Sequence, residues 1–197
     1  MGDRTLTPLA LAVLDLLHER DMHPYEMHQT MLTRQTDQRM KIKAGSLYHT
    51  VERLNADGLI EARETTREGR RPERTVYGLT ESGSAAFTNR IREMLSRVPQ
   101  EYPEFPVALS MLHNLPREDA LDHLARRVVQ LEARAAGTKV VVADLADRGL
   151  PDLYWIDVRY TQAMADAELA WTKKLLDDLR TGRPGWPCRP DDPKDTP

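Results

Sequence analysis

Residues 44–60 read AGSLYHTVERLNADGLI and carry the signals of a short helix. Leu47, Val51 and Leu54 are spaced four and three residues apart, so a helix would place them on one buried stripe. Ser46 is the predicted N-cap residue, because a serine hydroxyl accepts hydrogen bonds from the free backbone amides of a first helical turn. The pattern leaves the opposite face of this helix free for a partner.

The same segment contains the signal that ends the helix. Gly58 suits the left-handed backbone position just past a helix, and Leu59 would then fold back onto Leu54 in a Schellman motif. The sequence therefore predicts a short helix that is bounded at both ends.

An arginine-rich turn follows this helix within ten residues. Residues 59–65 and 75–79 each support a short strand, and Gly69 and Pro72 mark a turn between them. A capped helix followed by a basic β-hairpin is the arrangement of a winged helix-turn-helix, in which the helix reads DNA and the wing holds the backbone. The local pattern thus favours a DNA-binding domain.

The distribution of charge supports this interpretation only modestly. The 197-residue chain has a net charge of −3, which argues against indiscriminate binding to nucleic acid. Residues 39–77 contain nine Lys and Arg against six Asp and Glu, a local charge of +3, and the remainder carries −6. Positive charge is concentrated where the predicted helix and wing lie.

The flanking segments complete the predicted N-terminal domain. Helices are predicted over about residues 8–19, 24–34 and 81–97, the first of them with Thr7 as its N-cap. We therefore predict a winged helix-turn-helix domain over residues 5–98.

The C-terminal half contains two long apolar stripes. The first follows a heptad pattern with alternating spacings of three and four: Leu121, Leu124, Val128, Leu131, Ala135, Thr138, Val142 and Leu145. The second lies beyond a Gly-Leu-Pro break: Leu153, Ile156, Tyr160, Met164, Ala167, Trp171 and Leu175.

Two long helices joined by a short turn form an antiparallel hairpin. One hairpin has little to cover two apolar stripes, so we predict that a second copy covers them and that residues 100–181 form a helical dimerisation domain. Packing of the heptad stripe within the chain is the alternative. Residues 182–197 are rich in Pro and Asp and are predicted to be disordered.

Several motifs of the first ninety residues occur together. They are LTPLALAVL at 6–14, PYEM at 24–27, GSLY at 45–48, RL at 53–54, GLI at 58–60, GRRP at 69–72 and YGLTESG at 77–83. With these motifs, residues 5–90 resemble the PadR family of bacterial transcriptional regulators, and the C-terminal helices resemble it in architecture. The family usually has Gly-Tyr where this chain has Pro24-Tyr25, a departure that changes the turn and leaves the fold intact.

The resemblance implies a homodimer that binds a palindromic operator, usually as a repressor, and that is often released by a small molecule such as a phenolic acid. It also implies that the long C-terminal helices form the dimer. A winged-helix adaptor that binds protein instead of DNA is the alternative function, and its expected sign, an acidic wing, is missing here.

The predicted contacts follow from these patterns. Those with DNA are Lys41, Lys43, Ser46, Tyr48, His49, Thr50, Arg53, Arg70, Arg71 and Arg74. Those of the dimer are Leu121, Leu124, Val128, Leu131, Ala135, Val142, Leu145, Ile156, Tyr160 and Trp171.

Some of these residues have a second interpretation. Arg53 can read guanine or pair with Glu52 or Glu61, and Tyr48 can pack or contact a phosphate. The aromatic residues Tyr154, Trp155 and Trp171 are candidates for an effector pocket, with plain interface packing as the alternative.

No pattern indicates an enzyme, a cofactor or a metal site. His18, His23 and His28 are five residues apart, so a helix would not place them on one face, and the single Cys188 rules out a cysteine-rich zinc site. Phosphate loops and nucleophile motifs are absent from the sequence. No apolar run reaches the roughly 20 residues of a membrane span. We therefore expect a cytoplasmic regulator whose partners are double-stranded DNA and a second copy of itself.

Overall fold

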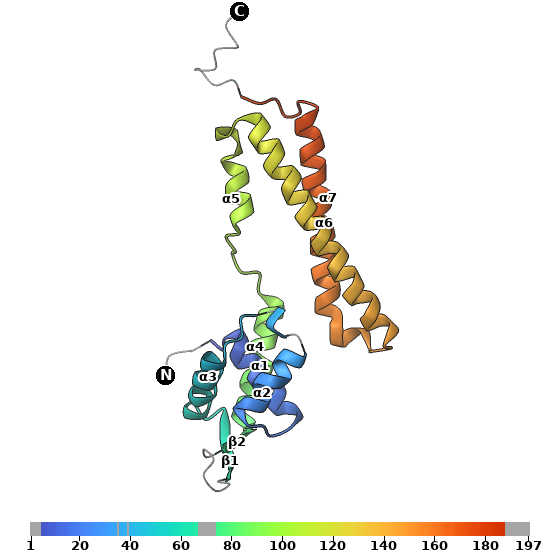
Figure 1. Cartoon of the computed structure of the whole chain (residues 1–197). Helices are drawn as coiled ribbons and strands as arrows, with labels where there is room; N and C mark the ends of the chain where they lie inside the picture. The colour runs from blue at the N-terminus through green and yellow to red at the C-terminus, as the bar shows by residue number, and fades with distance from the viewer. Residues whose placement is uncertain (1–4, 35, 39, 67–73, 188–197) are drawn as a thin grey trace, which may run out of the picture. The chain divides into compact units, whose positions relative to one another are not determined.

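The computed structural model describes residues 5–34, 36–38, 40–66 and 74–187. The chain forms two compact units, Met1–Gln100 and Glu101–Pro197 (Figure 1). Helices dominate both units, and within the described residues the only sheet is a two-stranded hairpin in the first unit. The predicted fold class, mainly helical with an N-terminal hairpin and long C-terminal helices, is confirmed.

Three helices enclose the core of the first unit. Leu14, Met27 and Leu47 come from successive helices and are each fully buried in one apolar cluster. The first helix begins as predicted, because the Thr7 hydroxyl accepts a hydrogen bond from the Ala10 amide at 3.2 Å. The elements are α1 (Pro8–Glu19), α2 (Pro24–Thr33), the short 3-10 helix η1 (Thr36–Gln38), α3 (Ala44–Ala56), β1 (Ile60–Thr66), β2 (Arg74–Leu79) and α4 (Glu81–Ser96).

The start of α3 differs from the prediction, and its end agrees with it. Lys43 is the N-cap residue instead of Ser46, since the Lys43 carbonyl already accepts the first helical hydrogen bond. Gly58 has a φ of 70°, and its amide donates to Asn55 O at 3.0 Å. The Leu59 amide donates to a backbone carbonyl oxygen in the last turn of α3. These are the two hydrogen bonds of the predicted Schellman motif.

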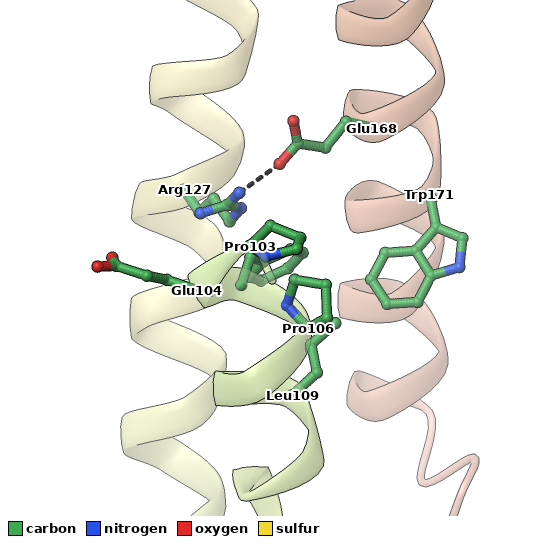
Figure 2. A pocket seen from close by; sticks show the side chains of 8 residues that line it. Pro103, Glu104, Pro106, Leu109, Arg127, Glu168 and Trp171 are labelled. Atoms are coloured by element: carbon green, nitrogen blue, oxygen red, sulfur yellow. Dashed lines mark hydrogen bonds and ion pairs between the residues drawn. The ribbon is translucent and has the colours of Figure 1, made fainter. Parts of the chain in front are cut away.

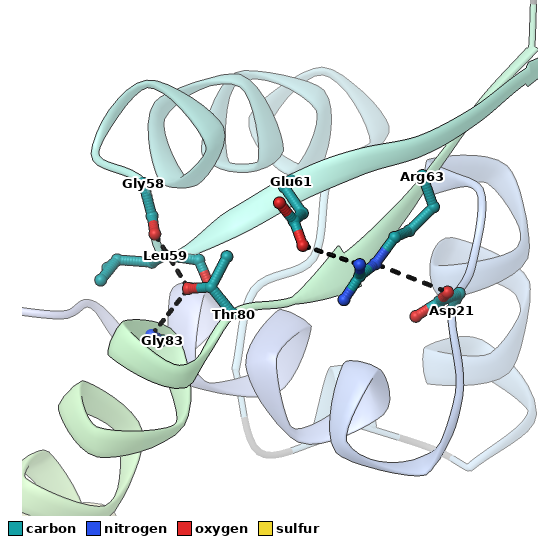
Figure 3. Close-up of polar contacts among 7 residues, drawn as sticks. All are labelled: Asp21, Gly58, Leu59, Glu61, Arg63, Thr80 and Gly83. Atoms are coloured by element: carbon teal, nitrogen blue, oxygen red, sulfur yellow. Dashed lines mark hydrogen bonds and ion pairs between the residues drawn. The ribbon is translucent and has the colours of Figure 1, made fainter.

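One threonine joins the end of α3 to the start of α4. The Thr80 hydroxyl lies 2.9 Å from the carbonyl oxygens of both Gly58 and Leu59, and it accepts a hydrogen bond from the Gly83 amide at 3.0 Å (Figure 3). The Thr80 amide also donates to Leu59 O at 3.2 Å. α3 and α4 are therefore connected directly at the base of the hairpin.

The hairpin is held to the helical core at its base. β1 and β2 are antiparallel, with Ile60 opposite Leu79. Met22, in the turn between α1 and α2, exchanges two backbone hydrogen bonds of 3.0 Å with Tyr77 of β2. The turn before α2 thus acts as a short third partner of the hairpin.

An ion pair links the ends of α1 and α2. Arg34 donates to both carboxylate oxygens of Glu19, at 2.5 and 2.8 Å, and this hydrogen bonding holds the pKa of Glu19 below its ordinary value of 4.5. A lowered carboxyl pKa stabilises the fold above the unfolded pKa, and the contribution is lost as the pH falls through the folded value.

Replacing Arg34 by Met should therefore lower the free energy of unfolding at pH 7, and because both side chains are about half exposed the loss should be below about 1 kcal/mol. Urea unfolding of both proteins from pH 7 down to about pH 2 measures this effect, and the difference should close on acidification. If the two proteins differ in unfolding free energy by the same amount at every pH, the ion pair with Arg34 is not what lowers the pKa of Glu19.

The second unit is built around a long helical hairpin. Arg117 near the start of α6 donates to the carbonyl oxygens of Leu179 and Arg180 at the end of α7, so the two helices run antiparallel (Figure 1). The elements are α5 (Glu104–Ser110), the 3-10 helix η2 (Leu112–Asn114), α6 (Arg117–Asp147), the 3-10 helix η3 (Asp152–Trp155) and α7 (Ile156–Arg180).

The heptad stripe of α6 packs within the chain. Leu124 clusters with Leu176 and Leu179 of α7, and Leu131 is only 6% exposed. The prediction that this stripe is a free dimer face is therefore wrong for Leu124, Leu131 and Ala135, which are buried in the single chain. The other predicted contacts on the stripe are half-buried, and their part in a dimer stays a prediction: Leu121, Val128, Val142 and Leu145.

The start of the C-terminal tail is also part of this core. Trp186 packs against the cluster around Leu124, and its indole nitrogen donates to Leu115 O at 3.2 Å. The prediction of disorder is wrong for residues 182–187, since one aromatic ring suffices to attach this segment. Residues 188–197 lie outside the described part of the chain.

Candidate nucleic-acid interface

α3 presents one polar face to solvent. Its opposite face is buried through Leu47, Val51 and Leu54, which belong to the core of the first unit. The polar face carries exposed side chains at four of the predicted positions, Ser46, Tyr48, His49 and Arg53, and Glu52 is exposed between them. The buried stripe therefore fixes which side chains are available to a partner.

Three cations at α3 have no acidic partner among the described residues. Lys41 and Lys43 are exposed just before the helix, and Arg53 is exposed on it. Among the described residues, no ion pair joins Arg53 to Glu52 or Glu61, the two acids that the sequence offered as its partners. These charges remain available for an anionic ligand.

Arg63 at the base of the wing is different. Its guanidinium lies 2.8 Å from a Glu61 oxygen and 4.0 Å from an Asp21 oxygen (Figure 3). It is shared between two acids, so Arg63 fixes the hairpin to the turn after α1 more than it adds free positive charge.

Thr50 was predicted to contact DNA, and the structure contradicts this. Its side chain is on the buried side of α3, 8% exposed, and its hydroxyl donates to Ser46 O at 2.8 Å. The hydroxyl is thus used inside the helix. The predicted wing contacts Arg70 and Arg71 lie outside the described residues, as does the side chain of Arg74, whose backbone begins β2.

The second apolar stripe, along α7, is largely uncovered in the single chain. Tyr160 is 67% exposed, and its neighbours on the stripe are exposed as well. They are Leu153, Ile156, Met164, Ala167 and Trp171. Isolated exposed apolar residues are ordinary, but a continuous helical stripe of this length marks an interaction surface.

A pocket of about 690 Å³ lies between α5, α6 and α7 (Figure 2). Phe105 in its wall contacts two other lining residues: the Trp171 ring meets the Phe105 ring edge to face with centroids 6.1 Å apart, and the Arg127 guanidinium lies 3.6 Å from the Phe105 ring centroid. Arg127 also pairs with Glu168 of α7. The volume is that of a small-molecule site. The lining residues are Pro103, Glu104, Phe105, Pro106, Leu109, Arg127, Glu168 and Trp171.

The three predicted effector residues do not lie together. Trp171 lines the pocket, but Tyr154 and Trp155 lie beyond the other end of α7, in η3. Tyr154 is 80% exposed, whereas Trp155 is buried and its indole donates to Leu150 O at 3.2 Å. Sequence patterns did not predict that Phe105, Arg127 and Glu168 form a pocket, because these residues converge only through the packing of three helices.

In the described part of the chain, no group of His, Cys, Asp and Glu side chains is arranged to hold a metal ion. No helix described is both long and apolar enough to span a membrane.

The fold resembles solved structures along most of the chain. Bacillus subtilis PadR in complex with operator DNA has a TM-score of 0.69 at 21% identity, over 87% of this chain and 97% of that one. A structure of the same protein in complex with p-coumaric acid has a TM-score of 0.70 at 18% identity, over 87% of this chain and 98% of that one. The structure of the Vibrio cholerae virulence activator AphA has a TM-score of 0.66 at 19% identity, over 88% of this chain and 98% of that one.

No protein with a curated function matches the chain significantly in sequence. Residues 13–89, which include most of the first unit, match the model of the transcriptional regulator PadR-like family. This family is one of regulators and not of enzymes. Residues 13–89 are therefore assigned to the PadR-like family of transcriptional regulators, and the fold of the solved PadR structures extends along most of the chain.

Proposed function

We propose that the protein is a homodimeric repressor that binds a palindromic operator through α3 and the wing and is released by a small molecule. Family membership supplies DNA binding and transcriptional regulation. The observation that supports α3 as the contact is its exposed polar face with the unpaired Lys41, Lys43 and Arg53. Two such helices about 34 Å apart would enter successive major grooves. The site of action is the cytoplasm, where the DNA of a bacterial regulator lies.

Unpaired cations are what a DNA contact requires. A lysine that neutralises a phosphate releases condensed counterions, so each contact adds both affinity and salt dependence. A cation already held by a carboxylate, as Arg63 is by Glu61, gains less from this exchange. Lys41 and Lys43 precede α3 and Arg53 lies on it, so these cations, which have no acidic partner within the described part of the chain, could contact the DNA backbone at more than one point.

The test is binding to the DNA just upstream of the coding region, against scrambled DNA, across a salt series. Replacing Lys41 and Lys43 together by Ala should weaken binding at least tenfold. A dimer then loses four cations, so the slope of log K against log salt should fall by up to about 3.6.

The matched control is the double variant Lys173→Ala and Lys174→Ala. It removes the same charge from α7, where both lysines are paired with acids, and should leave the slope nearly unchanged. If upstream and scrambled DNA bind equally weakly and neither double variant matters, the adaptor function is favoured instead.

Release by a small molecule is supported by the pocket next to the unit boundary. Its wall α5 begins at Glu104, a few residues after the first unit ends at Gln100, so a bound molecule would contact the segment that joins the units. An effector must bind the free and DNA-bound conformations unequally. p-Coumaric acid, which is bound in a structure of Bacillus subtilis PadR, is the first compound to test.

We expect an effective compound to release DNA from the unaltered protein and to change its tryptophan fluorescence. Trp171→Ala should keep DNA affinity and require at least tenfold more compound, because the ring forms one side of the pocket. Equal release from both proteins would place the effector elsewhere.

A further inference from the structure

A carboxylate lies at the centre of the exposed face of α3. At about 100° per residue, Glu52 and His49 fall within about 30° of the direction opposite the buried stripe, whereas Tyr48 and Arg53 fall about 70° from it. The centre of a recognition helix faces the floor of the major groove, and its flanks face the two backbones. Glu52 is therefore positioned toward base edges.

The Glu52 carboxylate is available to accept hydrogen bonds. Its side chain is 71% exposed, and Oε2 lies 3.4 Å from Nδ1 of His49. Oε1 has no hydrogen-bonding or ionic partner among the described residues. Glu19 and Glu61, by contrast, are paired with arginines in the same unit. The basic surface around α3 thus leaves its one central acid unneutralised by Lys or Arg.

We infer that Glu52 is a specificity-determining residue that selects cytosine in each operator half-site; this rests on the proposed binding of DNA through α3. In the major groove, cytosine presents its N4 amino group as a donor, whereas guanine presents O6 and N7 and thymine presents O4, all acceptors. Adenine presents the N6 amino group beside the acceptor N7, which repels the second carboxylate oxygen. A carboxylate therefore accepts from cytosine and is repelled by guanine and thymine.

The same charge lowers affinity for every other sequence. An acid on the DNA-facing surface is repelled by the phosphates wherever no amino group lies within its reach. Discrimination by repulsion of wrong partners is a general source of specificity. Glu52 thus has two effects, a contact with one base and a reduction in binding to the rest.

The test begins with selection of binding sites from a random duplex library by the full-length protein and by its Glu52→Gln variant. At each operator position where the two selected sequences differ, the affinities of both proteins for all four base pairs are then measured. The unaltered protein should enrich cytosine at one position of each half-site and prefer it about tenfold. Glutamine has nearly the same shape, and it pairs with adenine through N6 and N7, so Glu52→Gln should shift the preference from cytosine to adenine.

The control is Asp57→Asn, which removes the same charge from the end of α3, about 110° from the centre of the exposed face. It should raise affinity for all four base pairs alike and leave the selected sequence unchanged. If Glu52→Gln behaves like Asp57→Asn, or if the position it alters is not a cytosine, the inference is overturned. If the unaltered protein selects no sequence at all, the proposed function itself fails.

Discussion

Replacing Gly83 by Ala is expected to destabilise the first unit by about 3 kcal/mol or more. A Cβ at this position would lie 1.9 Å from the carbonyl oxygen of Leu59 and 2.9 Å from Cδ1 of Leu79. The first atom is backbone and cannot rotate away. It also accepts hydrogen bonds from the amide and hydroxyl of Thr80, so any shift that relieves the clash breaks them.

The distribution of tryptophans makes this effect easy to localise. All three, Trp155, Trp171 and Trp186, lie in the second unit, whereas circular dichroism reports helices of both units. In urea, Gly83→Ala should move the circular dichroism transition to lower concentration and leave the tryptophan transition in place.

The matched control is Gly137→Ala, in the middle of α6. A Cβ there meets nothing within 4 Å, and alanine favours a helix, so the second unit should gain about 0.5–1 kcal/mol. Unchanged unfolding of Gly83→Ala by both probes would show that the junction at Leu59 adapts without cost.

If the α7 stripe forms the proposed dimer, Tyr160→Glu is expected to convert it into monomers and to weaken operator binding at least 100-fold. The side chain is 67% exposed in the single chain and lies in the middle of the α7 stripe, where a second copy would bury it. An unpaired charge in such an interface is strongly unfavourable. A monomer engages one half-site and loses the second, which removes most of the affinity of a palindromic site.

Sedimentation velocity and operator titration test this expectation together. Ala170→Glu is the control, because it adds the same charge to an exposed position of α7 about 80° from the stripe and should stay dimeric. Leu131 is a poor choice for this purpose, since it is buried against α7 and a charge there would unfold the hairpin itself. A dimeric Tyr160→Glu would exclude the α7 stripe as the interface.

Much of the first unit follows from local signals in the sequence. Thr7 with Pro8 predicts the start of α1, and Gly58 with Leu59 predicts the end of α3, because caps depend on neighbouring residues only. The prediction of Ser46 as the N-cap of α3 is wrong. The N-cap is Lys43, and where α3 starts depends on the path of the preceding loop as well as on side-chain type. For α3, local residue types predict where the helix ends, but they do not decide between neighbouring positions for its start.

The second unit was harder to predict because its two stripes have the same periodicity. Spacing alone shows that Leu131 and Tyr160 each lie on an apolar face, but it does not tell which face packs within the chain. The pocket is harder still to predict from the sequence. Arg127 and Glu168 are 41 residues apart and meet only because α6 and α7 are antiparallel in one register.

The hydroxyl of Thr80 has a mechanical consequence. It ties Gly58 and Leu59, which directly follow α3, to the first turn of α4. A rotation of α4 would therefore be passed to the end of α3 through these hydrogen bonds. If two copies bind one operator as proposed, a small twist of α4 would misalign both α3 helices.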